Sequence, residues 1–324
     1  MQIGVSRAAS DKVRIVMPAP RGYQQPGSSW GPQAGDCFDM PISQRIAYML
    51  SGLTGRLRHH PACPACGNAD GRTVDRKWFH TLIECRECLL LHRFPVESAQ
   101  TMSTFYDAGY AEPGLTTELP DDATLSRLLA TGFKDSGKDF TYHASILTAL
   151  GLQPKARILD FGANWGYASW QFARAGFDVT SFEISKPRAA YGAKLGLTIH
   201  TDLDAVGDGF DAVYSSHVLE HTPNPREALA QQLAVVKPGG LVVAHTPNGS
   251  AGFRQANPVG FNKMWGLVHP VLLTDGFVAG VAGASPLLVG SDDRPEFVAA
   301  WDGRSQVRQP ADGAGLFFVI RGGE

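Results

Sequence analysis

Two features are scarce in this 324-residue sequence: an excess of charge of one sign, and long uninterrupted apolar runs. The formal net charge is −2 and the pI is about 6.5, which does not indicate a strongly basic nucleic-acid-binding protein. Residues 1–17 contain no apolar core of the length that a signal peptide needs. The most apolar C-terminal stretch, residues 268–290, is interrupted by His269, Asp275 and prolines. We therefore expect buried structure there, no membrane span, and a cytoplasmic protein.

Cysteine is also scarce, with five residues in the chain. Four of them form two C-x2-C pairs separated by 18 residues: Cys63, Cys66, Cys85 and Cys88. Each pair can form a tight knuckle, and two knuckles supply four thiolates for a tetrahedral structural zinc site that has no open position for a substrate. Redox-active pairs, an iron–sulfur cluster or cysteines without a function are the alternatives. We expect zinc, and we expect Cys37 to be an inert free thiol.

The segment that carries these pairs, residues 59–94, is too small to fold on a hydrophobic core of its own, so a metal would supply its folding energy. Basic residues surround the cysteines: Arg56, Arg58, Arg72, Arg76, Lys77, Arg86 and Arg93. Because a zinc ion bound by four thiolates is negatively charged, the simpler interpretation of these residues is local compensation of charge. The alternative is a surface for RNA or for an anionic substrate.

The rest of the composition is that of a globular protein, with 44% hydrophobic and 19% charged residues. The length allows a large core and more than one domain. Residues 1–58 are rich in proline, glycine and serine, and we expect a loose segment that ends in a short amphipathic helix. After the zinc ribbon at 59–94, we expect a helical lid or linker at 95–150. An α/β core then follows at 151–324, with an insert at about 250–275.

The most informative stretch is residues 156–183. It begins as a buried strand at Ile158 and Leu159, ends that strand on Asp160, and continues into a glycine turn and a helical run. A second strand then ends on Glu183. This order is the first half of a nucleotide-binding βαβ unit. Glycines let the backbone approach a ligand, the helix N-terminus points at it, and the closing acid can accept both ribose hydroxyls.

Asp160, the acid before the glycine turn, helps to decide which kind of nucleotide the site can bind. A dinucleotide fingerprint is G-x-G-x-x-G, which wraps a pyrophosphate, whereas this turn lacks the central glycine and follows Asp160. A carboxylate there repels a pyrophosphate and favours a ligand that carries an ammonium and a sulfonium. The stretch resembles motif I of the class I S-adenosylmethionine-dependent methyltransferases. The resemblance implies these donor-binding residues: Asp160, Gly162, Ala163, Asn164, Gly166, Glu183, Asp202 and Ser216.

Further motifs follow in the order in which that family has them. A fourth strand at 210–214 leads into S-S-H-V-L-E-H, and K-P-G-G and T-P-N flank a fifth strand at 241–244. The resemblance covers residues 140–250 and implies an α/β, Rossmann-like sheet of seven strands, the last one antiparallel. We expect its remaining strands at 197–200, 287–290 and 316–320. A flavodoxin-like or dehydrogenase fold without a methyl donor is the alternative.

One short motif has a second interpretation. H-V-L-E-H, residues 217–221, is also the H-x-x-E-H signature of a class of zinc peptidases. Here it directly follows a strand in a βαβ series, and the methyltransferase motif accounts for it. We therefore expect Glu220 and His221 to brace the segment after strand four. A role as metal ligands stays open, because metal-dependent methyltransferases exist.

Methyl transfer from a sulfonium is an in-line displacement, so the protein mainly aligns the two reactants and excludes water. An acceptor hydroxyl or acidic carbon also needs a base. His217 leaves the fourth strand, where this fold places its reacting groups, and histidine titrates near neutral pH. His269 is the second candidate, and a structural role is the alternative for both. Tyr106, Tyr110 and Tyr142 precede motif I and are candidate lid residues, with packing as their alternative.

The acceptor is the least defined part of the prediction. The N-P-P-Y motif of exocyclic-amine methylases is absent, with Ser215-Ser216-His217 in its place, which favours an oxygen or carbon acceptor. A four-cysteine module joined to such a core resembles bacterial methyltransferases of nucleotide sugars or glycan precursors. We therefore expect methyl transfer to a small molecule, with S-adenosylmethionine and a structural zinc as cofactors. An RNA methyltransferase and a non-catalytic scaffold are the main alternatives, and a dehydrogenase is a more distant one.

Overall fold

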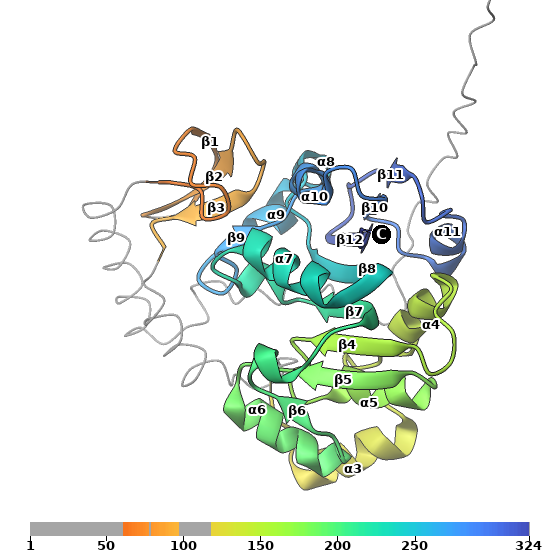
Figure 1. The fold of residues 1–324 in the computed structure, drawn as a ribbon. Helices are drawn as coiled ribbons and strands as arrows, with labels where there is room; N and C mark the ends of the chain where they lie inside the picture. The colour runs from red at the N-terminus through yellow and green to blue at the C-terminus, as the bar shows by residue number, and fades with distance from the viewer. Residues whose placement is uncertain (1–60, 78, 97–117, 324) are drawn as a thin grey trace, which may run out of the picture.

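The computed structural model describes residues 61–77, 79–96 and 118–323. The expected N-terminal helix and the residues Cys37, Tyr106 and Tyr110 lie outside these ranges. The described chain forms a large sheet covered by helices, and a small sheet that carries the cysteines (Figure 1). None of its helices is both long enough and apolar enough to cross a membrane.

The large sheet has eight strands in the order β11-β10-β12-β8-β7-β4-β5-β6. The strands are β4 (Arg157–Phe161), β5 (Asp178–Phe182), β6 (Ile199–His200), β7 (Phe210–Ser216), β8 (Val236–Pro247), β10 (Leu287–Gly290), β11 (Gln306–Arg308) and β12 (Gly315–Arg321). Neighbours are parallel, except that β12 runs antiparallel to both β8 and β10. The α/β Rossmann-like sheet with an antiparallel last strand is confirmed. The expected seven strands were one short, because β11 is a three-residue edge strand without an apolar run.

The central strands bury both of their faces. On β4, the neighbours Ile158 and Leu159 are fully buried and belong to two different hydrophobic clusters. On β8, Val242 and Val243 divide between the same two clusters. Since successive strand residues point to opposite faces, a sheet covered on both sides needs apolar residues at consecutive positions. This explains the continuous apolar runs in the sequence.

Helices supply the other half of each cluster. One face of the sheet packs on α4 (Thr141–Ala149), α5 (Tyr167–Arg174) and α11 (Pro295–Ala299). The opposite face packs on α7 (Pro225–Val235) and α10 (Asp275–Ala282). Beyond β5, α6 (Lys186–Tyr191) packs beside β6, and α3 (Asp122–Thr131) packs on the tryptophan of the glycine turn. The C-terminal edge of β4, β5 and β7 carries the residues that were singled out for donor binding.

Two expected boundaries differ from the structure. The strand expected at 197–200 is shortened to the two residues of β6, because the 3-10 turn η1 (Gly192–Leu195) follows α6. The K-P-G-G sequence, expected to precede the strand at 241–244, lies inside β8, which begins directly after α7. A register shift opposite Phe210 and Ala212 accommodates it, and Gly239 has a φ of +72°, a conformation that favours glycine.

The small sheet has the order β1-β2-β3-β9 and combines two distant parts of the chain. Its first three strands are β1 (Gly71–Lys77), β2 (His80–Cys85) and β3 (Leu91–Phe94). The fourth, β9 (Val271–Leu272), comes from the segment after β8, which also holds α8 (Ala251–Ala256) and α9 (Pro258–Met264). In Figure 1 the cysteine module, residues 61–96, therefore lies against β9.

Candidate functional site

The glycine turn between β4 and α5 is fixed to the end of β5. The backbone amides of Gly162 and Ala163 both donate to the carbonyl of Phe182, at 2.8 Å each. Gly162 has a φ of +85°, and a Cβ there would lie 2.3 Å from a side-chain methyl of Val218. Any side chain at this position would therefore collide with the segment after β7. Asn164 and Gly166 also have a positive φ, of +54° and +91°.

Two buried carboxyl groups flank this turn. Asp160 is 3% exposed and accepts a 2.6 Å hydrogen bond from Ser169 Oγ. Burial, assisted by the nearby charge of Glu183, raises the pKa of Asp160 to about 7. Glu183 is 6% exposed and accepts from the backbone amides of Asn164 at 3.0 Å and Ser185 at 2.8 Å. Its pKa is also raised by burial, so an added cation at this place would stabilise both ionised groups.

The structure brings together six of the eight residues predicted to bind the donor: Asp160, Gly162, Ala163, Asn164, Gly166 and Glu183. The other two, Asp202 and Ser216, follow or end the neighbouring strands β6 and β7. Asp202 is exposed, and its side chain caps the 3-10 turn η2 (Leu203–Ala205) by accepting from the amide of Asp204 at 3.1 Å. Its hydrogen bond is thus local.

The segment after β7 begins with a strained histidine. His217 has a φ of +55°, and its Nδ1 lies 3.1 Å from Oε1 of Glu220. Its side chain is 44% exposed, whereas Glu220 is completely buried and also accepts from Thr246 Oγ1 at 3.0 Å. Burial opposes ionisation of Glu220, but the hydrogen bond from His217 and the histidines nearby lower its pKa to about 2. A buried carboxylate therefore orients an accessible imidazole, which is the arrangement of a general base and its partner.

His221 and His269 lie next to this pair and pack against each other, with ring centroids 4.8 Å apart. Nδ1 of His221 lies 2.8 Å from the carbonyl of Val268, and Nδ1 of His269 lies 2.6 Å from the carbonyl of Met264. Because a carbonyl only accepts, both rings carry their proton on Nδ1. Burial lowers the pKa of both, that of His269 to about 4, so both are neutral at pH 7.

Glu220, His221 and His269 are also close enough to hold a metal ion, with one donor atom of each inside a 4.8 Å group. However, both oxygens of Glu220 are engaged by protein groups, His217 and Thr246. The H-V-L-E-H sequence also forms the short 3-10 turn η3 (Leu219–His221) rather than the α-helix of a zinc peptidase. Hydrogen bonding therefore accounts for this group without an ion.

A second polar cluster lies beneath the ends of β7 and β8 and was missed by the sequence analysis. Tyr142 donates to Asp293 at 3.2 Å, and Nδ1 of His245 lies 3.5 Å from the other oxygen of Asp293. His143 stacks edge-on against His245 at 4.7 Å and pairs with the hydroxyl of Tyr214 at 2.8 Å. Burial lowers the pKa of His143 to about 3 and that of His245 well below its usual value. His245 directly follows the strand expected at 241–244, and Asp293 comes shortly after β10, so both lie near the carboxyl ends of strands, where this kind of fold places its functional residues.

The four cysteines of the module form one compact group. Their sulfur atoms all lie within 4.8 Å of one another, with Cys63–Cys88 and Cys66–Cys85 at 3.5 Å each. A tetrahedron with Zn–S bonds of about 2.3 Å has edges of about 3.8 Å, which fits this spacing. Contact with Cys63 and burial raise the pKa of the Cys88 thiol, and burial raises that of Cys66. A bound cation would favour the thiolate forms, so the residues fit a closed structural zinc site.

Each cysteine pair lies on a tight knuckle. The amide of Gly67 donates to the carbonyl of Cys63 at 2.8 Å, and the amide of Leu89 donates to the carbonyl of Cys85 at 3.0 Å. Both donors have a positive φ, +75° for Gly67 and +64° for Leu89. Glycine adopts this conformation freely, whereas leucine does not, so the second knuckle is strained where the first is not.

The middle of the chain is similar to known proteins. Residues 136–271 match the family model of the methyltransferase domain. A demethylmenaquinone methyltransferase of Renibacterium salmoninarum is 35% identical over 115 residues, which are 33% of this chain and 48% of that protein. A ubiquinone biosynthesis O-methyltransferase of Cereibacter sphaeroides is 38% identical over 103 residues, 28% of this chain and 41% of that protein. The chain thus spans less than half of the length of these two relatives.

Solved structures are more distant. The plantazolicin methyltransferase BpumL, crystallised with a desmethyl plantazolicin analogue and SAH, is 13% identical and covers 69% of this chain and 95% of its own, with a TM-score of 0.46. The family match extends from just before α4 to β9, and so includes the glycine turn, both buried acids and the H-V-L-E-H turn. The middle of the chain is therefore similar to methyltransferase domains, and the cysteine module precedes it.

Proposed function

We propose that the protein transfers a methyl group from S-adenosylmethionine to an oxygen or carbon atom of a small molecule. The observation that carries this proposal is the pair of buried acids at the glycine turn, Asp160 and Glu183, inside a matched methyltransferase domain. Burial raises the pKa of both carboxyl groups, that of Asp160 to about 7, and this suits a ligand that brings its own positive charge. A pyrophosphate would meet repulsion at the same place.

In this proposal the donor-binding residues have separate tasks. Asp160 pairs with the donor's ammonium group, and Glu183 accepts from its ribose hydroxyls. The turn residues 162–166 pack closely against the donor, because Gly162 allows the backbone to approach it. Asp202 and Ser216 complete the site from the ends of β6 and β7. S-adenosylmethionine supplies a methyl group on a sulfonium, whose C–S bond breaks as the acceptor bond forms, leaving a neutral thioether.

The acceptor must lose a proton in the same reaction. We propose that His217 accepts this proton as a general base, because its ring is accessible and Glu220 holds the ring in place. His269 is the second candidate, but burial lowers its pKa to about 4, which makes it a weak base, and a backbone carbonyl directs its ring, which suits a bracing role beside His221.

For the acceptor, we propose a small molecule with an ionisable hydroxyl or an acidified carbon. The named relatives act in quinone biosynthesis, and the four-cysteine module resembles methyltransferases of nucleotide sugars or glycan precursors. Both classes provide oxygen or carbon nucleophiles, so we propose a screen that begins with sugar nucleotides and continues with phenolic quinone precursors.

The arginines of the cysteine module speak against the RNA alternative. Arg72 is paired with Glu84 at 2.6 Å, Arg86 lies 3.5 Å from Asp70, and Arg93 is completely buried. Cations that are engaged in this way contribute less to an RNA-binding surface. A gel-shift experiment with RNA at low salt tests this alternative, and a salt-dependent shift would restore it.

Calorimetry with S-adenosylmethionine tests the donor site. We expect Asp160→Ala and Glu183→Ala each to weaken donor binding by about 100-fold, since each removes a buried charged hydrogen-bond partner. Asp178→Ala is the matched control, because this exposed aspartate lies at the opposite end of β5. Wild-type affinity in both site variants would contradict the assignment. Normal donor binding without turnover of any acceptor would favour the scaffold alternative.

A further inference from the structure

One short segment connects the cysteine module to the side of the proposed site that holds His217, His221 and His269. We call this the acceptor side, because His217 is the proposed base for the acceptor. Its first residues face the site: the carbonyl of Val268 meets the ring of His221, and His269 packs against that ring. The next residues join the module. The carbonyl of Pro270 accepts from the amide of Arg93 at 2.8 Å, and β9 pairs with β3. Residues 266–275 therefore belong to both structures.

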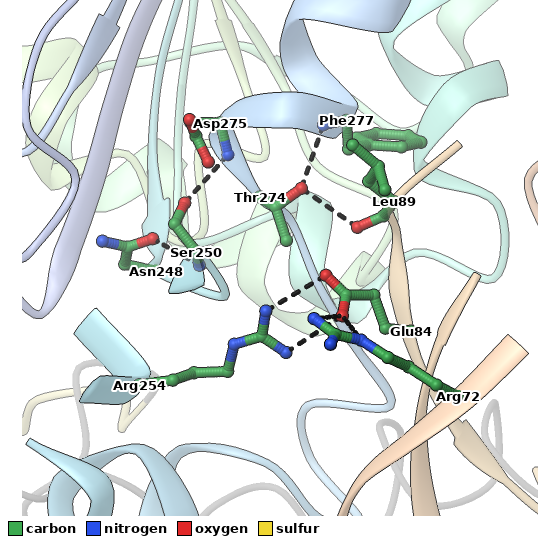
Figure 2. A network of polar contacts seen from close by, with 9 residues as sticks. All are labelled: Arg72, Glu84, Leu89, Asn248, Ser250, Arg254, Thr274, Asp275 and Phe277. Carbon is green, nitrogen blue, oxygen red and sulfur yellow. Dashed lines mark hydrogen bonds and ion pairs between the residues drawn. The ribbon is translucent and has the colours of Figure 1, made fainter. Parts of the chain in front are cut away.

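The end of this segment is held by the second cysteine knuckle. Thr274 caps α10 by accepting from the amide of Phe277, and it donates its hydroxyl to the carbonyl of Leu89 at 3.0 Å (Figure 2). Leu89 lies one residue after Cys88, in the strained left-handed conformation. A Cβ on Gly276 would lie 2.6 Å from the Leu89 side chain, so knuckle and helix pack closely. The position of the knuckle thus sets the start of α10.

An ion-pair network also fixes the module to α8. Glu84 of β2 accepts from Arg254 of α8 at 3.0 Å and from Arg72 of β1 at 2.6 Å, as Figure 2 shows. The side chains of Glu84 and Arg254 are only 10% and 12% exposed, so solvent screens this pair weakly. Nearby, Asp75 accepts from Nε1 of the buried Trp265 at 2.8 Å. The contact is therefore a packed, polar interface.

Within the described residues, β3 is the sheet neighbour of β9, and a single bridge joins the adjacent Leu273 to Asn248. A two-residue strand has few hydrogen bonds of its own, so its position depends on its partner strand together with the packing of Val271 and Leu273 against the core of the large sheet. The partner, β3, begins directly after the Cys85–Cys88 knuckle. A module of this size would gain folding energy from a bound metal, and that metal would then contribute to the order of residues 266–275.

We propose that the metal-bound cysteine module is a positioning element of the methyl-transfer site, and that it holds His221 and His269 in place through residues 266–275. The proposal rests on the proposed function, because only methyl transfer gives the site a side that binds the acceptor. It assigns no contact with the donor to the module, because the proposed donor residues lie at the ends of β4, β5, β6 and β7 and in the turn after β4. Loss of the metal should therefore disturb one half of the site and leave the other intact.

Hydrogen exchange on the full-length, zinc-loaded protein tests this inference, before and after removal of the metal by a chelator. We expect amides in peptides that cover 264–275 to exchange at least about tenfold faster in the metal-free protein. We expect the affinity for S-adenosylmethionine to change by less than about twofold. This second measurement separates the inference from the proposed function, since failure of donor binding in the zinc-loaded protein would concern the proposed function alone.

A pair of variants keeps the test valid if removal of the metal unfolds the chain. Glu84→Gln leaves Arg254 without its charged partner, and it should accelerate exchange in 264–275 while zinc stays bound. Glu87→Gln is the matched control, because this exposed glutamate of the same module bonds to Asn68. Faster exchange in Glu84→Gln alone supports the proposal. Equal exchange in both variants, exchange confined to 61–96 on metal removal, or a purified protein without metal would overturn it.

Discussion

The cysteine module and the donor site are assembled in opposite ways. The module draws its four ligands from two knuckles, each closed by a local hydrogen bond between residues four apart. The donor site draws its residues from the ends of separate strands, which the large sheet places side by side. In our proposal a bound metal stabilises the first arrangement, whereas the second is supported by a core that is buried on both faces.

This difference separates stability from ligand binding. Removing a ligand residue from the module should change whether residues 61–96 fold. Removing a polar residue from the donor site should change affinity while the sheet persists, because the strands beneath it are fully buried. The predictions below test this contrast, from the largest expected effect to the smallest.

The largest effect is expected for the cysteines. Cys63→Ser and Cys88→Ser should reduce the zinc content from about one ion per chain to none, because a structural zinc contributes on the order of 10 kcal/mol to the folding of such a module. Metal analysis of the purified protein measures this. Cys37→Ser is the control and should keep its zinc. Stoichiometric zinc in both module variants would show that the four thiols are not the ligands.

The next effect concerns the proposed base. His217→Gln should lower kcat by about 10²- to 10⁴-fold on an accepted substrate, with donor affinity unchanged, since general base catalysis contributes that much. His269→Gln should lower it less, because His269 braces a neighbour. The comparison needs an acceptor from the screen and a single-turnover assay. A larger loss of kcat in the His269 variant would indicate that His269 is the base and His217 the bracing residue.

A steric change at the glycine turn should be smaller. Gly162→Ala places a Cβ 2.3 Å from Val218 at a positive φ, and it should weaken donor binding by about tenfold or more. Gly196→Ala is the matched control, since Gly196 has a similar φ of +72° but nothing within 4 Å of a Cβ. Calorimetry separates the collision from backbone strain. Equal losses in the two variants would leave strain as the whole explanation.

The smallest effect is a dependence on pH. Asp160 has a pKa of about 7, so below that pH it carries a proton that a cationic ligand must displace. Donor affinity should fall by up to about tenfold per pH unit below pH 7, and proton release should accompany binding. Without ligand the sign reverses: since the pKa is above its unfolded value, this group's contribution to stability is lost as pH rises through 7. Asp160→Asn should remove both dependences, and an unchanged slope in that variant would assign them elsewhere.

The sequence predicted those parts of the molecule that local patterns determine. The four cysteines come together as their spacing predicts, and so do the turn residues with Asp160 and Glu183. Both depend on short-range geometry: a knuckle in one case, and a strand, turn and helix in the other. The strand runs were equally visible, because burial on both faces requires consecutive apolar residues.

Long-range packing could not be predicted in the same way. The pairing of β3 with β9 joins residues about 180 positions apart, and a two-residue strand leaves no periodicity. The cluster of His143, His245 and Asp293 combines a helix, a strand end and a loop, which meet only when the sheet order is known. The short edge strand β11 was missed because its exposed residues show no apolar pattern.

The central claim is that one chain holds a structural zinc in the module and a methyl donor at the glycine turn. Native mass spectrometry of the purified protein, with and without S-adenosylmethionine, tests it most directly. The account predicts one zinc per chain in both samples and one added donor molecule in the second. Zinc without any bound donor at saturating concentration would contradict it, and would leave a scaffold with the cysteine module as its working surface.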